Sequence, residues 1–310
     1  MPSPIAANLS ITLAGGASLH AYFPSQGPPP DIAVIVVPGG SYRPGPYGWC
    51  KTAEGSDVAV WLASVGVVGI VLHYRLPAGR PLVPLADASN AITAVKSGLG
   101  PLPTPALVGI MGFSAGGHLA ALASTRFAGR STRPDLTLLF YPLVSMATEN
   151  YTHANSRREY LGAKPSPQLV EEFSADRQLT ARSPPAFLVH AQDDRVVSVK
   201  SSQLYYDACI ASSVPCAFVQ MDSGGHPWVN KPQVWLPART AALTWMCATL
   251  LHLGHERTRA PTPKGPPTLP SVRAPSGCEQ VEGRGALRAR LLRLHGVASV
   301  SLYRPPDTLY

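Results

Sequence analysis

Six consecutive apolar residues, IAVIVV at positions 32–37, constrain the fold of this chain more than any other segment. The run is rich in β-branched residues and contains no polar side chain, which favours a strand that is buried on both faces. Strands of this kind occur in parallel sheets that carry helices on both sides. We therefore expect an α/β architecture with a mostly parallel central sheet.

The alternation of strand and helix patterns continues along the chain. A hairpin is predicted from residues 5–13 and 18–23, which flank Gly15 and Gly16. Further strands are predicted at 67–74, 106–111, 136–141, 186–191 and 216–221, and helices at 57–65, 87–97, 116–126, 200–212 and 233–253. In open α/β sheets, ligands bind at the carboxyl ends of the strands, so functional residues are expected in the loops that follow them.

Residues 145–182 interrupt this pattern with a polar stretch that holds one short predicted helix, 168–173. We interpret the stretch as a lid-like insertion over the site. A surface connection without function is the equally open alternative.

Composition suggests one large domain over residues 1–254 and a distinct tail over 255–310. Of the net charge of +8, the tail carries +5, from nine Lys or Arg and four Asp or Glu. Because the excess lies mostly in the tail, nucleic-acid binding is not expected. Residues 260–275 contain six prolines and predict a linker. Residues 286–294 could form a basic amphipathic helix, but a disordered extension is the interpretation that we favour.

The five cysteines form no CxxC pair, and we expect them to be buried or free thiols. Residues 1–10 lack the basic and apolar regions of a signal peptide, and no run of about 18 apolar residues occurs. The expectation is a cytoplasmic protein without a membrane span. The sequence does not indicate the oligomeric state.

The motif GFSAG at 112–116 fits G-x-S-x-G and lies between a predicted strand and a predicted helix. This strand–turn–helix context is typical of a nucleophile elbow, in which small neighbours let the serine hydroxyl stand clear of the backbone. Ser114 is therefore the candidate nucleophile.

A serine nucleophile needs a base, and that base needs a carboxylate, in the chain order Ser, acid, His. Asp193 and Asp194 follow the strand at 186–191, and His226 follows the last predicted strand. We predict His226 as the base and Asp194 as the acid, with Asp193 as the alternative.

The anion formed on the attacked carbonyl oxygen needs preorganised donors. The backbone N–H of Ala115 is one candidate, and Gly39, Gly40 and Ser41, after the first buried strand, are the others. Aromatic residues on nearby loops predict flat walls for a substrate: Tyr42 and Trp228 first, then Tyr47 and Trp49.

These segments together resemble the lipase and esterase branch of the α/β-hydrolases, in particular bacterial-type acetylesterases and acetyl xylan esterases. The resemblance runs through about residues 30–250 and is carried by PGGSY (38–42), LHYRLP (72–77), MGFSAGGHLA (111–120), RPDLTLLFYP (133–142), HANSRREYLG (153–162), PPAFLVHAQDDRVV (184–197) and SGGH (223–226). It implies an α/β-hydrolase fold, a Ser114–His226–Asp194 triad, oxyanion donors in the PGG loop, and hydrolysis of short-chain esters, especially O-acetyl groups on sugars, without metal or cofactor. At one position the chain departs from the family: Pro227 follows the histidine where glycine is usual.

Other functions stay open at this point. A different hydrolase of the same mechanism, such as an arylformamidase or a peptidase, would use the same residues, because a fold does not fix its substrate. A catalytically silent binding protein and an interaction protein that acts through its tail are alternatives from other classes.

Overall fold

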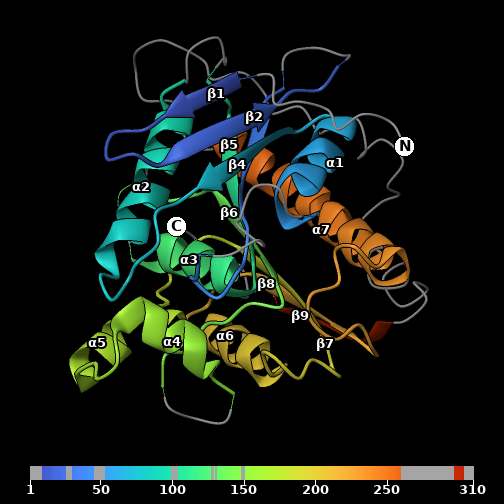
Figure 1. The fold of residues 1–310 in the computed structure, drawn as a ribbon. Coiled ribbons are helices and arrows are strands. Elements are labelled where there is room, and N and C mark those ends of the chain that lie inside the picture. Colours follow the sequence, from blue (N-terminus) through green and yellow to red (C-terminus); the bar gives the residue numbers. More distant parts are fainter. Residues whose placement is uncertain are drawn as a thin grey trace.

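The computed structural model describes residues 9–25, 30–44, 53–98, 104–126, 129, 131–147, 151–259 and 297–303. Nine strands in these ranges form one sheet in the order β1-β2-β4-β3-β5-β6-β7-β8-β9 (Figure 1). The strands from β4 to β8 in this order are parallel, whereas β1, β2 and β9 pair antiparallel with their neighbours. The mostly parallel sheet expected from the apolar runs is confirmed.

Strands β1 to β8 form where the sequence predicts them. The hairpin consists of β1 (Leu9–Thr12) and β2 (Ser18–Tyr22). The parallel strands are β3 (Ile32–Val37), β4 (Val68–His73), β5 (Leu107–Phe113), β6 (Leu136–Phe140), β7 (Ala186–Ala191) and β8 (Cys216–Met221). All six residues of β3 are buried, as a strand covered on both faces requires.

Helices cover the two faces of the sheet and create two hydrophobic cores. On one face lie α2 (Leu82–Lys96), α3 (Ser114–Thr125) and α6 (Lys200–Ala211), and on the other lie α1 (Val58–Ser64) and α7 (Pro232–Arg259) (Figure 1). Alternate residues of a strand enter opposite cores: Val34 and Val36 face α1 and α7, whereas Ala33 and Ile35 face α2 and α3. This packing fixes the carboxyl ends of the parallel strands along one edge of the sheet.

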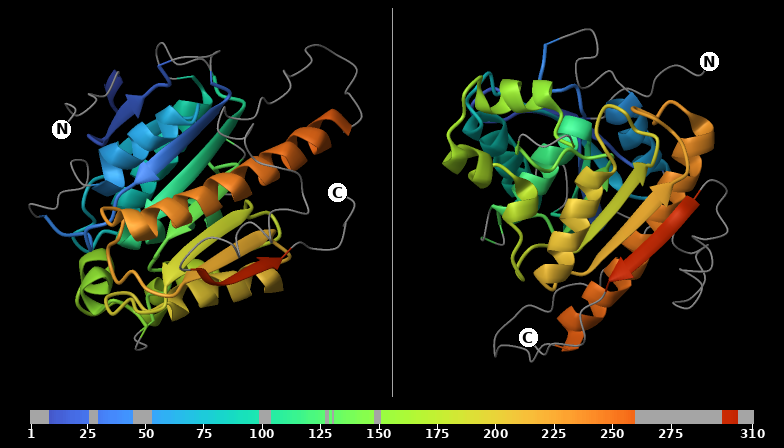
Figure 2. Two further views of the ribbon diagram at one scale, coloured as in Figure 1. Left: turned by 90° about the vertical axis from the view of Figure 1, so that its right-hand side faces the viewer. Right: turned by 90° about the horizontal axis from the view of Figure 1, so that it is seen from below.

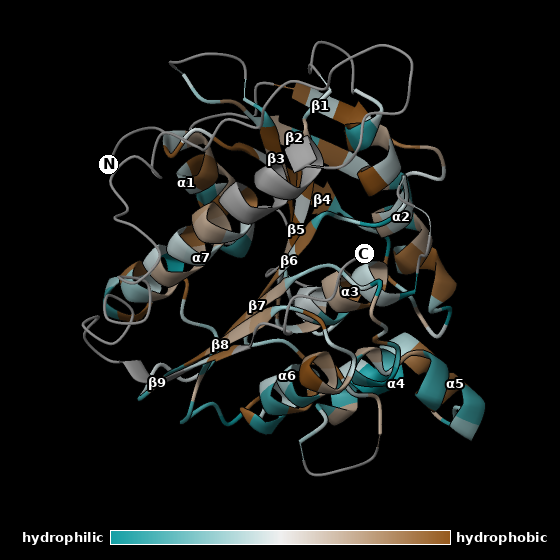
Figure 3. Ribbon diagram, turned by 180° about the vertical axis from the view of Figure 1, so that it is seen from behind, coloured by the Kyte–Doolittle hydropathy of each residue, from teal (hydrophilic) through white to brown (hydrophobic). Residues whose placement is uncertain are grey.

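The insertion at 145–182 is packed against the domain. It contains α4 (Ala154–Leu161), α5 (Pro167–Glu172) and the short helix η2 (Ala175–Arg177), of which the sequence indicated only α5. The outer surfaces of α4 and α5 are largely hydrophilic (Figure 3), but Tyr160 and Phe173 are buried in the core beside α3. An ion pair of 3.2 Å between Glu159 on α4 and Arg43 ties the insertion to the loop after β3.

The boundary predicted at residue 254 is wrong, because ordered elements extend beyond it. Helix α7 ends at Arg259, and β9 (Val297–Tyr303) pairs antiparallel with β8 at the edge of the sheet (Figure 2). The tail therefore contributes a strand rather than being disordered throughout. The predicted linker at 260–275 and the amphipathic helix at 286–294 lie outside the described residues. Cys247 is disulfide-bonded and Cys209 and Cys216 are free, which corrects the expectation of five thiols.

Candidate active site

Ser114 stands at the sharp turn between β5 and α3, with a left-handed backbone angle φ of 52°. Such an angle is costly for a residue that carries a side chain, so the surrounding packing must hold it. A Cβ atom on Gly116 would collide with the backbone oxygens of Val37 and Pro38, which explains why this neighbour is glycine. The predicted elbow is present.

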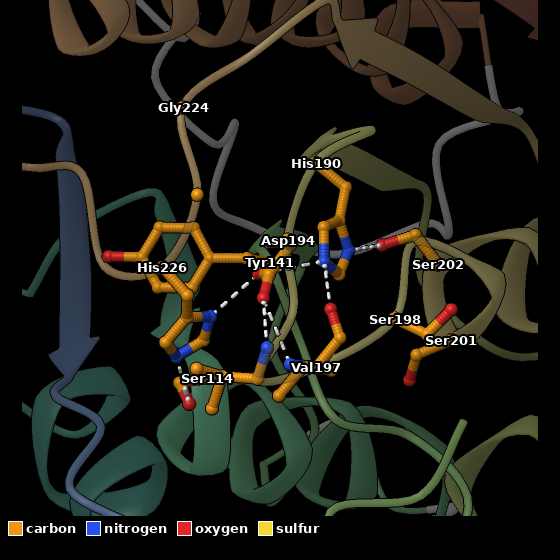
Figure 4. A network of polar contacts seen from close by, with 12 residues as sticks. Ser114, Tyr141, His190, Asp194, Val197, Ser198, Ser201, Ser202, Gly224 and His226 are labelled. Carbon is orange, nitrogen blue, oxygen red and sulfur yellow. Dashed lines mark hydrogen bonds and ion pairs between the residues drawn. The ribbon is translucent and has the colours of Figure 1, made fainter. Parts of the chain in front are cut away.

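The structure brings Ser114, His226 and Asp194 into one chain of hydrogen bonds (Figure 4). The Ser114 Oγ lies 2.9 Å from Nε2 of His226, and Nδ1 of His226 lies 2.7 Å from Oδ2 of Asp194. Because an ionised carboxylate only accepts, Nδ1 carries the proton and Nε2 is left to accept from the serine hydroxyl. Pro227, where the chain departs from the family pattern, does not keep the imidazole from either partner.

The Asp194 carboxylate is fully enclosed and receives several donors. Its Oδ1 accepts the backbone N–H groups of Val196 and Val197, each at 2.9 Å. Burial would raise the pKa of this carboxyl, but hydrogen bonds from His190 and His226 outweigh that effect and hold the pKa well below its usual range. The carboxylate therefore stays charged at neutral pH beside the imidazole.

A second histidine contacts the same carboxylate. The Nε2 atom of His190 lies 3.2 Å from Oδ2 of Asp194 and 2.9 Å from the Val197 carbonyl oxygen (Figure 4). Both neighbours are acceptors, so Nε2 is the protonated nitrogen, and Nδ1 accepts from the Ser202 hydroxyl at 2.8 Å. His190 thus donates to the same carboxylate oxygen as His226 and helps to orient the acid.

Asp193, the alternative acid, forms hydrogen bonds with the backbone of the loop before His226. Its Oδ1 accepts the backbone N–H groups of Gly224 and Gly225, each at 2.8 Å. The Nζ of Lys231 donates to the Gly224 carbonyl oxygen at 2.7 Å. These contacts hold the loop that carries His226. Asp193 therefore fixes the loop, whereas Asp194 contacts the imidazole itself.

Three residues in the loop after β3, Gly39, Gly40 and Ser41, were predicted as oxyanion donors, and the structure excludes one of them. The N–H of Gly39 donates to Oε2 of Glu54 at 2.8 Å, so it is not available to a substrate. Within the described ranges, the N–H groups of Gly40 and Ser41 have no acceptor in the protein. The N–H of Ala115 lies at the N-terminal end of α3, where the partial positive charge of the helix also favours an anion.

The two aromatic residues predicted to contact substrate do not line an open surface. Tyr42 is only 2% exposed, and its hydroxyl donates to the Ala115 carbonyl oxygen at 2.7 Å. Trp228 is 0% exposed and packs against the rings of Phe140 and Tyr141. Both are core residues, Tyr42 in the core on one face of the sheet and Trp228 in the core on the other. Tyr47 and Trp49 lie outside the described residues.

Two further residues contact the site, and no sequence motif identifies them: Glu54, which is partly buried, and Tyr141, which is fully buried. Glu54 lies on a single π-helical turn, Ala53–Asp57, and accepts the hydroxyl hydrogen of Tyr141 at 2.7 Å. The ring of Tyr141 packs edge-on against that of His226, with ring centroids 4.7 Å apart (Figure 4). An aromatic residue after β6 was visible in the sequence, but nothing there placed it on the imidazole.

Across the ranges that the structure describes, no three His, Cys, Asp or Glu side chains gather as metal ligands would. No helix in those same ranges is long and apolar enough to cross a membrane.

Two curated proteins with related sequences are named as enzymes that act on xylan or its acetyl groups. The chain is 33% identical over 223 residues to an acetylxylan esterase of Xylanibacter ruminicola, a match that covers 70% of this chain and 45% of that protein. It is 32% identical over 209 residues to an endo-1,4-beta-xylanase B of Butyrivibrio fibrisolvens, covering 62% of this chain and 32% of the relative. The chain thus spans less than half the length of these curated relatives.

Solved structures give the same fold. An acetyl ester-xyloside bifunctional hydrolase from Caldicellulosiruptor lactoaceticus superposes with a TM-score of 0.62 at 30% identity, covering 73% of this chain and 89% of that one. Esterase 2 of Thermogutta terrifontis, at 21% identity and a TM-score of 0.62, covers 80% of this chain and 92% of its own and shows the fold alone. The model of the BD-FAE family matches residues 19–209. The chain therefore has the α/β-hydrolase fold and belongs to the BD-FAE family.

Proposed function

We propose that this chain is a serine carboxylesterase that removes acetyl groups from O-acetylated carbohydrates. The observation that carries the proposal is the chain of hydrogen bonds from the Ser114 hydroxyl through His226 to Asp194, at 2.9 and 2.7 Å, on a strand–turn–helix elbow. The relatives named as an acetylxylan esterase and an acetyl ester-xyloside hydrolase support the choice of acyl group and substrate class.

The reaction follows from the geometry. The Ser114 Oγ attacks the ester carbonyl carbon while Nε2 of His226 takes the hydroxyl proton. The tetrahedral intermediate then collapses, and the imidazolium gives that proton to the departing sugar oxygen, which leaves an acetyl group on Ser114. A water molecule, deprotonated by His226, attacks the acetyl carbonyl, and acetic acid leaves as the proton on His226 returns to the serine; the acid then ionises in solution. Asp194 remains ionised and stabilises the imidazolium in both halves of the cycle.

The oxyanion formed in each half lies opposite the base. The N–H of Ala115 and those of Gly40 and Ser41 are the donors we assign to it. Gly40 and Ser41 have positive φ angles of 120° and 55°. Residues of regular strands and right-handed helices have negative φ angles, so the backbone of this loop turns in a way that neither element does. One such donor contributes roughly 100- to 1000-fold in kcat.

A panel of esters tests the substrate assignment. We expect 4-nitrophenyl acetate to give a higher kcat/KM than the butyrate, and the octanoate to be turned over barely at all. In a pocket fitted to a short acyl group, each methylene changes discrimination by about 1–3 kcal/mol, so several that do not fit exclude a long chain. Acetylated xylo-oligosaccharides should release acetate, measured by an enzyme-coupled assay with deacetylated oligosaccharide as the control.

Two results would change the assignment in different ways. A higher kcat/KM for octanoyl than for acetyl esters would replace it with a lipase-like function. Cleavage of aryl acetates without any release of acetate from sugars would leave the esterase and remove the carbohydrate. N-formylkynurenine in the same panel distinguishes an arylformamidase.

The dependence of kcat/KM on pH should report the base. His226 accepts a proton from the serine only as a neutral imidazole, so kcat/KM should fall on the acid side of the profile, where the base is protonated before it can act. Asp194 does not add a second loss there: hydrogen bonds outweigh its burial and lower its pKa, so the carboxylate is already ionised. We expect a slope of one proton in the free enzyme, measured with a substrate that does not titrate. A profile that is flat between about pH 5 and 8 would exclude a histidine base.

A further inference from the structure

Glu54 is a partly buried carboxyl group beside the nucleophile, and the reaction described above gives it no role. Its two oxygens accept from two different segments: Oε2 from the N–H of Gly39 at 2.8 Å, and Oε1 from the hydroxyl of Tyr141 at 2.7 Å. Burial raises the pKa of Glu54, and these two hydrogen bonds, together with the attraction of His226, oppose that rise. Burying a carboxyl is costly unless it is well partnered, so its position beside the site calls for an explanation.

At one end the carboxylate fixes the loop that carries the oxyanion donors. A Cβ atom on Gly39 would lie 2.9 Å from Oε2 of Glu54, 2.9 Å from the Phe113 carbonyl oxygen and 3.0 Å from the Cβ of Ser114. The loop is therefore held between Glu54 and the nucleophile, with no room for a side chain. A displacement of Gly39 would carry the N–H groups of Gly40 and Ser41 away from the reacting carbonyl.

This loop does not hold its shape by itself. Ser41 and Tyr42 have φ angles of 55° and 59°, and each such angle costs about 1–3 kcal/mol for a residue with a side chain. Contacts from outside the loop must therefore impose it. The Tyr74 hydroxyl donates to the Pro38 carbonyl oxygen at 2.9 Å, and Glu54 accepts from the next residue, Gly39.

The other oxygen of the carboxylate fixes Tyr141, whose ring packs against the imidazole of His226. Tyr141 is fully buried, and burial raises the pKa of its hydroxyl well above the usual value, so it remains a donor to Glu54. The ring of Tyr141 meets that of His226 at an interplanar angle of 71° (Figure 4). One carboxylate thus touches both the loop of the oxyanion donors and the residue packed on the imidazole.

We propose that Glu54 is a positioning residue that sets the oxyanion loop through Gly39 and the imidazole of His226 through Tyr141. The proposal rests on the proposed function, since it presumes acyl transfer at Ser114. Oxyanion donors act only within a few tenths of an ångström of their required position, so loosening them lowers the rate of the chemical step more than the binding of the substrate.

Three variants test this role. Glu54→Ala removes both contacts, and we expect kcat for 4-nitrophenyl acetate to fall about 100-fold with KM changed less than about threefold. Glu54→Gln can keep both contacts, since its oxygen can face Gly39 and its NH₂ group can donate to the Tyr141 oxygen, so kcat should recover to within about tenfold of wild type. Tyr141→Phe removes one of the two hydrogen bonds and should give a loss between these values.

The second measurement is the affinity for a trifluoromethyl ketone, which forms a tetrahedral oxyanion on the serine. A positioning role requires the inhibition constant to rise in parallel with the fall in kcat across the three variants. All rates are expressed per active site, titrated with an organophosphonate, so that misfolded protein does not count. The control is Asp135→Ala. Asp135 directly precedes β6, and its carboxylate also accepts a backbone N–H, that of Val108 near the start of β5, at 2.8 Å. The substitution should lower the melting temperature and leave kcat per active site unchanged.

Several outcomes overturn the inference. An unchanged kcat per active site in Glu54→Ala would overturn it. A fall in kcat without a rise in the inhibition constant of the trifluoromethyl ketone would overturn it as well. A Glu54→Gln variant as slow as Glu54→Ala would assign the effect to charge instead of positioning. If Glu54→Ala does not fold, the test rests on Glu54→Gln and Tyr141→Phe. A normal kcat and a normal affinity for the ketone in Tyr141→Phe would then reject the proposal that Glu54 positions His226 through Tyr141. A wild-type protein that neither cleaves esters nor reacts with the organophosphonate would instead reject the proposed function.

Discussion

Replacing Ser114 by alanine should lower kcat/KM for 4-nitrophenyl acetate by roughly a million-fold, and His226→Ala should cost about as much. The serine and the imidazole act as a unit, so removal of either leaves only the oxyanion donors and substrate binding to accelerate the reaction. The Ser114→Ala protein should keep its melting temperature within a few degrees, because only one hydroxyl group is lost.

The matched control is Ser124→Ala on the same helix. Ser124 is also buried, and its hydroxyl donates to the Ala120 carbonyl oxygen at 2.8 Å, far from His226 along α3. This variant should keep its activity. Normal ester turnover by purified Ser114→Ala would end the assignment of the nucleophile, and equal losses in both variants would point to a general effect on the helix.

Exchanging each of the two neighbouring aspartates for asparagine should give very different results. Asp194 accepts hydrogen bonds from two backbone N–H groups and from two imidazoles, and an asparagine has only one accepting oxygen for these donors. The imidazole of His226 then adopts the tautomer that carries its proton on Nε2, the nitrogen that faces the serine. In this form it cannot accept the serine proton, and we expect kcat to fall about 10⁴-fold.

Asp193→Asn should cost less than about tenfold in kcat. At Asp193 a single oxygen accepts both Gly224 and Gly225, so the oxygen of an asparagine can keep both contacts. Asp193→Ala, which removes the acceptor, should lower kcat further by loosening the loop of His226. If Asp193→Asn lost more activity than Asp194→Asn, the two roles would have to be exchanged.

The regular part of the fold could be predicted because local pattern and tertiary environment agree there. The apolar runs that became β3 and β7 are buried on both faces, so their composition reflects their surroundings directly. Strand β9 has no continuous apolar run that would reveal it, and its pairing with β8 is a contact between segments far apart in the chain. Helix α4 was missed because its sequence, ANSRREYL, is polar except where Tyr160 and Leu161 enter the core.

The site divides in the same way. The positions of Ser114, Asp194 and His226 followed from chain order and from the ends of strands, and the structure brings all three together. Tyr42 and Trp228 were expected on an open wall because loops near a site are often exposed, but packing in the two cores buries both. Glu54 is a single acidic residue at the start of a helical turn, and only the folded structure brings it to Gly39 and Tyr141.

The most direct test of the account is to look for the acyl-enzyme itself. Wild-type protein and the Ser114→Ala variant are mixed with 4-nitrophenyl acetate, quenched in acid within the first turnovers, digested and analysed by peptide mass spectrometry. We predict one acetyl group on Ser114 in the wild-type protein and none at this position in Ser114→Ala. Steady turnover by the wild-type protein with no acetyl group on Ser114 at any quench time, or with the acetyl group on another residue, would contradict the mechanism.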